Sequence, residues 1–514
     1  MQEEDQELSA LQEQWVQYML RPESDGAAML AADMGLGKTR TACMFAREYG
    51  ARCVLIVVPL QTMDDWVKTA GEVYPGLPVR IISSNAKGKK AMSDFQWRVA
   101  GIYFVTHQYW ESKAWVKQLV QKRRKTDPDK YRKVDSGVWG GEGFLFILDE
   151  SHRSANSDSW TFRALMRLDA HVFKLALSGT FMGDGFDGAY GATRWLWPHR
   201  TDIIPTSIFA WRKLWAETKY DRFAPRNEKT VGEKDEGAFV SALPCYIRAE
   251  SNQPDAIPHE VHVQIYPEQR RVYNELDDKM VAWINNNPLV AEYSITKRAR
   301  QRQTTLAMPT LIFDDKTGEL LDVVFENDAI SAKIDALFAE MEGRGELGDL
   351  MVDEPLLILT DSQKFARILT WRLNNRYGDV AREWSGKITK PRRKIVKQQF
   401  IDGEIKHIVG VQSAMGTGTD GLQYTDARIV VFMSRADRRI DNEQGVGRLN
   451  RTGQTQEVHE VRFIADDTVD TGQLSNQLSA AIKAARIMRA KVRKEKKMEE
   501  QRERDAKHNA HFGF

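Results

Sequence analysis

Two sets of short apolar runs, separated by longer helical patterns, constrain the fold of this chain more than any other feature of its sequence. The first set covers residues 53–58, 79–82, 102–105, 144–148 and 172–177, and the second covers 356–360, 407–411, 428–433 and 458–464. Continuous apolar runs with helices between them indicate parallel sheets that are buried on both faces. The sequence therefore predicts an α/β chain with two parallel-sheet lobes.

The segments outside these sets predict the domain boundaries. We expect the first lobe to cover residues 1–197 and the second to cover 331–472. Between them, residues 198–330 are aromatic-rich, mostly helical in pattern and broken by prolines, which is typical of an inserted region with a linker. Residues 473–514 predict a charged helical tail, and a basic stretch at 117–133 interrupts the first lobe.

Composition limits the classes of partner. The net charge of this 514-residue chain is only +2, so a nucleic-acid surface would have to arise from local clustering of basic residues. Its three cysteines include no C-x-x-C pair, which excludes a zinc-ligand spacing and a disulfide framework. The acidic N-terminus lacks signal-peptide order, and no apolar run approaches transmembrane length. We expect a soluble cytoplasmic protein with no membrane partner.

Residues 32–39 read ADMGLGKT, between an apolar run and a helical pattern, which is the context of a phosphate-binding loop. Gly35 and Gly37 allow the backbone N–H groups to turn toward phosphates, Lys38 can reach the β- and γ-phosphates, and the Thr39 hydroxyl can hold Mg²⁺. The first position is alanine where the strict pattern has glycine. The alternative interpretation is a chance glycine-rich turn between a strand and a helix.

The apolar run at 144–148 is followed by two carboxylates, Asp149 and Glu150. Ligands bind at the carboxyl ends of strands in open α/β sheets. Asp149 would hold Mg²⁺ through water, and Glu150 would polarise the attacking water. An acidic pair after a strand can also merely cap the next helix, but its combination with Lys38 and Thr39 favours a nucleotide site.

Residues 444–454 read QGVGRLNRTGQ and place two arginines three positions apart. If this segment is helical, Arg448 and Arg451 lie on one face and could both point at a γ-phosphate held by the other lobe. Such a guanidinium can contribute about 10³–10⁵ in rate. The alternative is a solvated basic helix face, which does not account for the flanking glutamines and glycines.

In this order, the motifs resemble those of a superfamily-two helicase of the Swi/Snf type of DNA translocase. The resemblance runs from Gln12 to Gln454. The segments that carry it are DMGLGKT at 33–39, VVPL at 57–60 followed by Trp66, DESHR at 149–153, LSGTF at 177–181, IPHEVHVQIYPEQRRVYNEL at 257–276, SAKI at 331–334, LLILTDSQ at 356–363 and QGVGRLNRTGQ. Phe181 stands where the family usually has proline.

This resemblance implies two RecA-like lobes and gives roles to further residues. Gln12 would recognise the adenine edge, with a surface glutamine as the alternative. Ser178 and Thr180 would couple hydrolysis to the nucleic-acid path, and Thr106 would contact the nucleic-acid backbone together with His107 and Gln108. The glycine-rich motif GTGTDGLQ at 416–423 can be aligned in two ways at Asp420. The further residues implied for nucleotide binding are Asp33, Met34 and Leu36, and those implied for coupling or DNA contact are Gly421, Gln423 and Gln444.

The resemblance further implies ATP and Mg²⁺ as cofactors and double-stranded DNA as the partner, with single-stranded or forked DNA as other possibilities. The implied activity is ATP-dependent movement along duplex DNA in replication, repair or recombination, which suits a phage-encoded protein in its host's cytoplasm or a prokaryotic protein. Two alternatives remain open. One is a strand-separating helicase acting on forked DNA or RNA, and the other is an ATP-dependent clamp that closes on DNA without hydrolysis.

Overall fold

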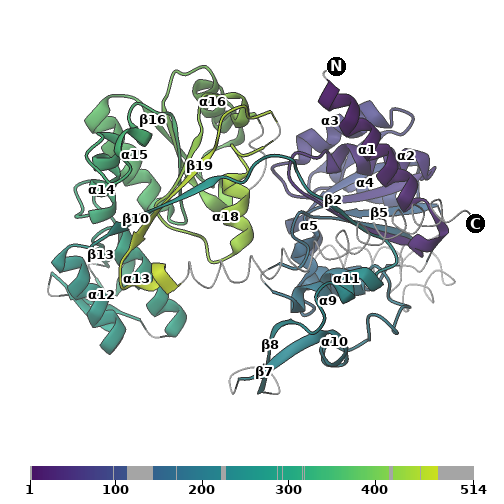
Figure 1. The fold of residues 1–514 in the computed structure, drawn as a ribbon, viewed down its shortest axis with the longest axis horizontal. Coiled ribbons are helices and arrows are strands. Elements are labelled where there is room, and N and C mark those ends of the chain that lie inside the picture. Colours follow the sequence, from purple (N-terminus) through teal and green to yellow (C-terminus); the bar gives the residue numbers. More distant parts are fainter. Residues whose placement is uncertain are drawn as a thin grey trace, which may run out of the picture. The chain divides into compact units, whose positions relative to one another are not determined.

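The computed structural model divides the chain into two compact units, Met1–Ser251 and Asn252–Ser479, which are described separately (Figure 1). The basic stretch and the charged tail singled out in the sequence lie outside the described residues. The structure describes residues 3–472 except 97, 113–142, 169–170, 184, 222–226, 286, 292, 315, 318, 416–420 and 452.

A parallel sheet forms the centre of the first unit, and its described strands follow the order β3-β4-β2-β5-β6-β1-β9. Because neighbouring strands are parallel, their carboxyl ends meet at one edge, where such sheets bind ligands. Strand β6 separates β1 from β5, so the two predicted halves of the nucleotide site follow nearby strands. The strands are β1 (Ala27–Ala32), β2 (Cys53–Val58), β3 (Val79–Ile81), β4 (Gly101–Thr106), β5 (Phe144–Leu148), β6 (Phe173–Leu177) and β9 (Tyr246–Ala249).

The helices and the remaining strands of the first unit surround this sheet. A separate antiparallel hairpin, β7–β8, pairs only with itself. The helices are α1 (Glu3–Met19), η1 (Pro22–Ser24), α2 (Lys38–Glu48), α3 (Met63–Val73), α4 (Ala86–Gln96), α5 (His107–Glu111), η2 (Ser151–Ser154), α8 (Trp160–Leu165), α9 (Asp187–Arg194), α10 (Ile208–Trp215) and α11 (Ala238–Ala242). The hairpin strands are β7 (Ala216–Tyr220) and β8 (Glu228–Glu233).

The second unit has its own parallel sheet, whose described strands follow the order β10-β19-β18-β15-β17-β16. Two antiparallel hairpins, β11–β12 and β13–β14, stand apart from this sheet. The strands are β10 (Ile257–Val263), β11 (Val281–Ile284), β12 (Asn287–Val290), β13 (Thr310–Phe313), β14 (Leu320–Val324), β15 (Leu356–Thr360), β16 (Ala381–Trp384), β17 (His407–Val411), β18 (Ile429–Phe432) and β19 (His459–Ala465).

Serine side chains fix where two helices of the second unit begin. The Ser331 hydroxyl accepts from Ile334 N–H at the start of α14, and the Ser362 hydroxyl accepts from Phe365 N–H at the start of α15. Each bond satisfies a backbone donor that the first helical turn leaves without a partner. The helices are α12 (Pro267–Lys279), α13 (Ser294–Leu306), α14 (Ala332–Met341), η4 (Gly348–Met351), α15 (Gln363–Tyr377), α16 (Lys390–Ile401), α17 (Gln412–Met415), η5 (Leu422–Tyr424) and α18 (Arg439–Val446).

The predicted fold class, α/β with two parallel-sheet lobes, is confirmed by these two sheets. Residues 198–330, expected as one mostly helical insertion and linker, are instead divided between the units. Strand β9 joins the first sheet beside β1, and β10 joins the second beside β19. Three hairpins, β7–β8, β11–β12 and β13–β14, lie in the same region. These strands are short and depend on partners distant in sequence, which local patterns do not reveal.

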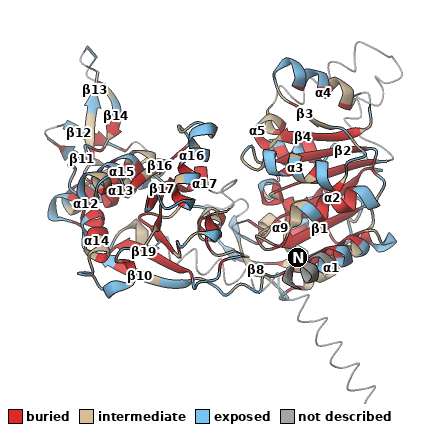
Figure 2. Ribbon diagram, turned by 90° about the horizontal axis from the view of Figure 1, so that it is seen from above, coloured by how far each residue is buried: buried red, intermediate tan, exposed pale blue. Residues whose placement is uncertain are grey.

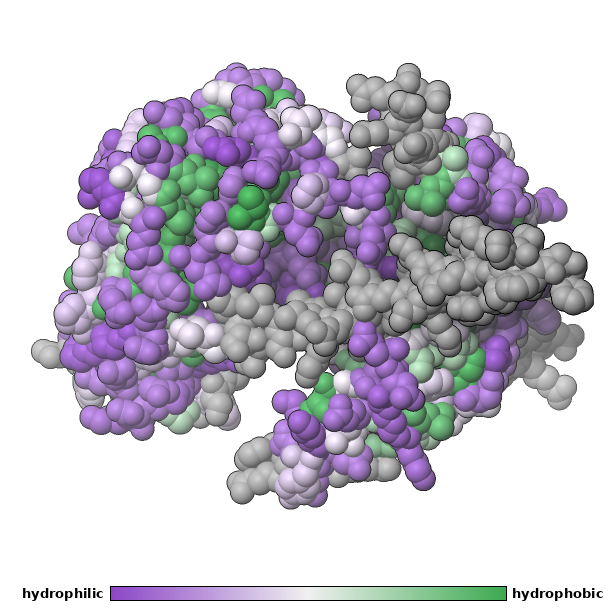
Figure 3. Space-filling model, viewed as in Figure 1, coloured by the Kyte–Doolittle hydropathy of each residue, from purple (hydrophilic) through white to green (hydrophobic). Residues whose placement is uncertain are grey.

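Buried residues are concentrated in the strands of both sheets, and exposed residues lie on the outer faces of the helices (Figure 2). All six residues of β1 are fully buried, as are the residues of β5 and β15. The face of the molecule in Figure 3 is predominantly hydrophilic. Among the described residues, no helix is long and apolar enough to cross a membrane.

Candidate nucleotide-binding site

The segment between β1 and α2 has the backbone geometry of a phosphate-binding loop. Gly35 and Gly37 have φ angles of +89° and +72°, which side chains other than glycine rarely adopt. Helix α2 begins immediately after Gly37, at Lys38. The N–H groups of its first turn have no partner within the helix, so they can bind an anion.

Lys38 is held within this loop. Its Nζ donates to the carbonyl oxygens of Ala32, at 2.8 Å, and Asp33, at 3.0 Å. These two bonds hold the ammonium group at the loop, and its three N–H donors can be divided between such carbonyl acceptors and phosphate oxygens. Thr39 lies in the same first turn of α2, and a hydroxyl oxygen there is a ligand type that Mg²⁺ accepts.

Gln12 packs directly against the loop, where the resemblance places an adenine contact. Its side chain is only 2% exposed, and its Nε2 donates to the Leu36 carbonyl oxygen at 3.3 Å. Its Oε1 is buried and has no hydrogen-bond partner within the described part of the chain. A Cβ on Gly37 would come within 2.2 Å of Gln12 Nε2, so any other residue there would displace the Gln12 amide. An acceptor without a partner beside the loop fits the amino group of a purine base.

The Asp33 carboxylate, expected to contact the nucleotide, is bound by residues at and after strand β9. Its Oδ1 forms a 2.8 Å ion pair with Arg248, and its Oδ2 accepts from Ser251 N–H at 3.1 Å. Arg248 also donates to the Ala31 carbonyl oxygen at 3.0 Å. Asp33 therefore ties the loop to the segment around β9. The flanking Met34 is half-buried, and Leu36 is buried.

The acidic pair lies at the carboxyl end of β5, close to the loop. Oδ2 of Asp149 accepts a 2.9 Å hydrogen bond from the indole of Trp66, and its Oδ1 accepts from Glu150 N–H at 3.0 Å. Glu150 has φ of +51°, a strained conformation for this residue type. Burial, followed by the charge of Glu150, raises the pKa of Asp149, while Trp66 and Lys38 oppose that rise.

Glu150 is the member of the pair that stays ionised. Burial acts against its charge, but the hydrogen bond and charge of His152, and then the charge of Lys38, hold the pKa of Glu150 below its usual range. Its Oε2 lies 3.3 Å from His152 Nδ1. An ionised carboxylate at this point can polarise a water molecule, which is the role predicted for it.

Ser178 connects the acidic pair to the next strand. The Nδ1 of His152 lies 3.4 Å from the Ser178 hydroxyl, which also accepts from Thr180 N–H at 3.1 Å. The residues after β5 and β6 are therefore linked by side-chain contacts. Phe181, at the position where the family usually has proline, is fully buried and packs edge-on against Tyr246 of β9.

The side chains of two residues expected to contact nucleic acid, Thr106 and His107, lie at the start of α5. The Thr106 hydroxyl accepts from Tyr109 N–H and caps α5. The His107 side chain is buried, and neither of its ring nitrogens has a hydrogen-bond partner among the described residues. Burial, followed by the charge of Arg153, lowers the pKa of His107 to about 3. Gln108 is exposed.

In the second unit, the arginine motif is less helical than expected. Helix α18 ends at Val446, so Arg448 and Arg451 lie in the turns that follow it and not on one helix face. The glycine at 453, with φ of +98°, makes a continued helix unfavourable. Arg448 is buried, and its Nε donates to the Gln444 carbonyl oxygen at 3.2 Å. Arg451 is half-buried.

Part of the glycine-rich motif of the second unit lies outside the described residues, which omit 416–420 and thus Asp420. Gly421 has φ of +101°, and its N–H donates to the side-chain Oε1 of Gln423 at 2.8 Å. Gln423 is buried. These two predicted residues therefore form one local turn.

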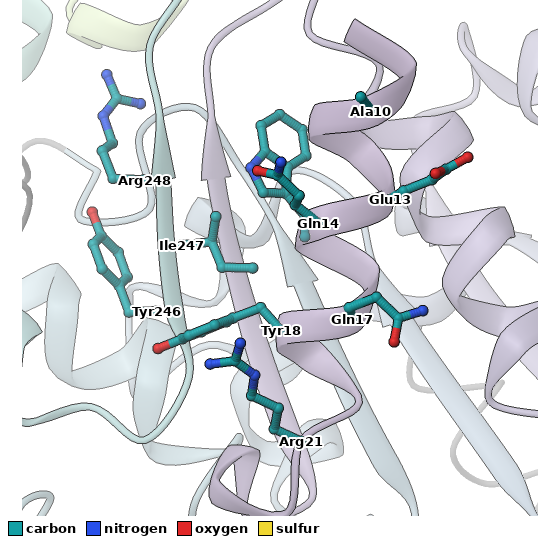
Figure 4. Close-up of a pocket in the computed structure, with 10 residues that line it drawn as sticks. Ala10, Glu13, Gln14, Gln17, Tyr18, Arg21, Tyr246, Ile247 and Arg248 are labelled. Atoms are coloured by element: carbon teal, nitrogen blue, oxygen red, sulfur yellow. The ribbon is translucent and has the colours of Figure 1, made fainter. Parts of the chain in front are cut away.

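A groove between α1 and the edge strand β9 is lined in part by Arg248, the ion-pair partner of Asp33. It has a volume of about 750 Å³ and includes none of residues 33–39 (Figure 4). The guanidinium of Arg21 lies over the ring of Tyr18, 5.1 Å from its centroid. The residues that line the groove are Ala10, Glu13, Gln14, Trp15, Gln17, Tyr18, Arg21, Tyr246, Ile247 and Arg248.

Sequence reasoning did not find the roles of three site residues. Trp66 holds Asp149 from 83 positions away, and Arg248 holds Asp33 from the other end of the unit. His152 connects Glu150 to Ser178. His152 lies inside the acidic motif and Trp66 follows the VVPL motif, so the sequence marked both residues but did not indicate their roles. The role of Arg248 could not be predicted, because a single arginine in a short apolar strand matches no local motif.

Comparisons with known proteins place this site in a family context. The profile of the SNF2-related domain matches residues 11–192. Two curated relatives are Protein CHROMATIN REMODELING 4 of Arabidopsis thaliana, 24% identical over 457 residues (86% of this chain and 19% of the relative), and ATP-dependent helicase FUN30 of Saccharomyces cerevisiae, 23% identical over 408 residues (74% and 34%). The chain thus spans about a fifth and a third of the lengths of these relatives.

A solved structure with some likeness to this chain is the Sulfolobus solfataricus SWI2/SNF2 ATPase core in complex with dsDNA. It is 18% identical, the match covers 90% of this chain and 89% of that one, and the TM-score is 0.34.

Proposed function

We propose that this chain, a Swi/Snf-type member of superfamily two whose residues 11–192 match the SNF2-related domain, is a nucleic-acid-dependent ATPase that moves along duplex DNA. One observation supports the ATPase proposal above all others. The phosphate-binding loop with Lys38 and the ionised Glu150 follow strands of one parallel sheet, and the charge of Lys38 acts on both carboxyls of the acidic pair. Binding and hydrolysis residues thus share one edge of the first unit.

In the proposed reaction, the loop N–H groups bind the phosphates, and Lys38 divides its N–H donors between its carbonyl acceptors and phosphate oxygens. Gln12 Oε1 accepts from the adenine amino group. Thr39 would supply a hydroxyl oxygen for Mg²⁺ and Asp149 would hold the ion through water; Mg²⁺, when bound, would neutralise charge on the phosphate oxygens. Glu150 orients and polarises the attacking water. His152, which contacts both Glu150 and Ser178, links a movement of the Glu150 carboxylate to Ser178.

Arg448 and Arg451 belong to the other unit, and we propose that they reach the γ-phosphate when the two units close on ATP. Guanidinium groups would neutralise the charge that spreads over the equatorial oxygens during transfer. Closure on binding and opening after hydrolysis would convert turnover into stepwise movement along a strand. The two arginines lie in turns and not on one helix face, so the conformation of these turns would determine how far the guanidinium groups extend toward the γ-phosphate.

Duplex DNA is the proposed partner because the motif sequences resemble those of the translocase branch. In addition, two curated relatives are named as a chromatin-remodelling protein and an ATP-dependent helicase. We propose a role in replication, repair or recombination inside the cell, in the host cytoplasm if the gene belongs to a phage. Gly421, Gln423, Gln444, Ser178 and Thr180 remain the proposed coupling residues, and backbone groups near Thr106 remain proposed nucleic-acid contacts.

An ATPase assay with duplex, single-stranded and forked DNA and with RNA tests this proposal. We expect duplex DNA to stimulate phosphate release most. Lys38→Ala and Arg451→Ala should each abolish turnover, and Glu150→Gln should abolish turnover while retaining ATP binding. The exposed Lys89 of α4 offers a matched control, since Lys89→Ala should hydrolyse normally. Stimulation by RNA alone, or normal turnover in Arg451→Ala, would contradict the proposal.

The two alternatives give different results in companion assays. Displacement of a triplex-forming strand without fork unwinding supports translocation, whereas unwinding of forked DNA supports a strand-separating helicase. ATP-dependent retention on DNA without phosphate release would identify a clamp. The presence of Glu150, Arg448 and Arg451 favours hydrolysis over the clamp.

A further inference from the structure

The β7–β8 hairpin projects from the first unit and adds little to its core (Figure 1). Its strands pair only with each other, and apart from Ala216 every residue in them is exposed or half-exposed. A two-stranded hairpin without a hydrophobic face is marginally stable in water. Burial of apolar surface therefore does not account for the stability of the β7–β8 hairpin.

Polar contacts hold the base of the hairpin in a fixed direction. The Thr230 hydroxyl donates to Oδ1 of Asp187 at 2.6 Å, and Arg212 forms a 2.6 Å ion pair with Oδ2 of the same carboxylate. The Glu233 carboxylate accepts two 2.7 Å hydrogen bonds from backbone N–H groups at the start of α11. The opposite end of the hairpin is thus presented outward from an anchored base.

That outer end has two faces of different chemistry. Lys219 and Lys229 stand directly opposite each other in the ladder, and both are exposed. In the described part of the chain, neither forms an ion pair with an acidic side chain. Like charges at directly opposed positions destabilise a hairpin. Because side chains alternate along a strand, Tyr220, which is 79% exposed, lies on the other face, where the exposed Glu228 stands directly opposite it.

We propose that the β7–β8 hairpin is a nucleic-acid contact outside the ATP site, in which Lys219 and Lys229 share a backbone phosphate and Tyr220 stacks on an unpaired base. This assignment rests on the function proposed above. An anion between the two ammonium groups removes their repulsion, and an exposed aromatic ring stacks on any unpaired base. A cationic face and an aromatic face on one thin element suit a junction between duplex and single strand, where a backbone and an unstacked base lie close together.

Replacement of both lysines by glutamine tests the cationic face. In Lys219→Gln/Lys229→Gln, the slope of log Kobs for forked DNA against log salt should become less steep by about 0.7–0.9, because the one phosphate contact that the two lysines share is lost. The thermal stability of the free protein should not fall, since the repulsion between the lysines is removed. The control Lys89→Gln/Lys90→Gln removes the same charge from exposed positions on α4 and should leave the slope unchanged. A hairpin variant with the parent slope overturns the proposal.

Replacement of Tyr220 tests the aromatic face. Tyr220→Ala should weaken binding to forked DNA by about 5- to 150-fold while binding to a fully paired duplex is retained, and Tyr220→Phe should bind both like the parent. Equal losses on both substrates, or none, would overturn the stacking assignment. Unchanged DNA binding together with capture of an acidic protein by the lysine face would also overturn it.

The parent protein separates this proposal from the proposed function. If DNA stimulates the parent ATPase and the hairpin variants bind like the parent, only the hairpin assignment fails. If the parent neither binds nucleic acid nor hydrolyses ATP in its presence, both proposals fail.

Discussion

The indole Nε1 of Trp66 donates a 2.9 Å hydrogen bond to Oδ2 of Asp149. Both side chains are buried, and the bond joins α3 to the carboxyl end of β5. A carboxylate that is to present one oxygen to a hydrated Mg²⁺ must keep a fixed orientation, and this bond supplies it. Trp66 is therefore a positioning residue for the proposed metal ligand.

Trp66→Phe should destabilise the first unit by about 1–3 kcal/mol, because Asp149 then keeps a buried acceptor without its donor. ATP turnover should fall as well, with a larger effect at low Mg²⁺. Denaturant titration and ATPase assays over a range of Mg²⁺ measure both. Trp160→Phe changes an exposed tryptophan of the same unit and should have little effect. Equal behaviour of the two variants would show that the indole N–H has no such role.

Gly37→Ala should abolish ATP binding. A Cβ at this position would meet Gln12 Nε2 at 2.2 Å, and the φ of +72° adds about 1–2 kcal/mol of strain. Gly50 has φ of +69° with no atom within 4 Å of its Cβ position, so Gly50→Ala carries the strain without the clash. Binding of a fluorescent ATP analogue should be lost in the first variant and kept in the second. ATP binding by Gly37→Ala would mean that Gln12 moves aside freely.

Arg248→Met should destabilise the first unit by about 1–3 kcal/mol and weaken ATP binding, because Asp33 loses its ion pair and the loop loses its link to β9. Arg47→Met breaks an exposed ion pair with Glu48 and should cost about 0–1 kcal/mol. Thermal unfolding and ATP titration compare the two. In a double-mutant cycle with Asp33→Asn, additive effects would argue against direct coupling.

The stability of the first unit should decrease as the pH falls from about 6.5 toward 3. Burial lowers the pKa of His107 to about 3 from its usual value of 6.5, so in this window the unfolded chain binds a proton that the folded protein excludes. The loss approaches about 1.4 kcal/mol per pH unit. His107→Phe should flatten this dependence relative to the parent. The lowered pKa of His407 in the second unit contributes equally to both proteins and cancels in the difference. Parallel pH profiles would contradict the prediction.

The sequence alone determined the features that depend on neighbouring residues. Apolar runs at regular intervals predicted both parallel sheets, because a strand buried on both faces must be apolar throughout. Glycines beside Lys38 predicted the loop, because only glycine readily adopts its positive φ angles. The carboxylates after 144–148 were also predicted from local sequence, because they directly follow an apolar strand and ligands bind at the carboxyl ends of such strands.

Tertiary structure decided everything that depends on pairing across long separations. Strand β9 and Arg248 reach β1 and Asp33 from more than two hundred positions away, and no local pattern encodes such a partner. The resemblance to a known family placed His107 beside the nucleic-acid backbone and indicated nothing about its side chain, which packing at the start of α5 buries. The free-standing β7–β8 hairpin was hidden within a region of helical appearance. Local sequence sets backbone preference and burial pattern, whereas the identity of a partner is fixed only when the whole chain has packed.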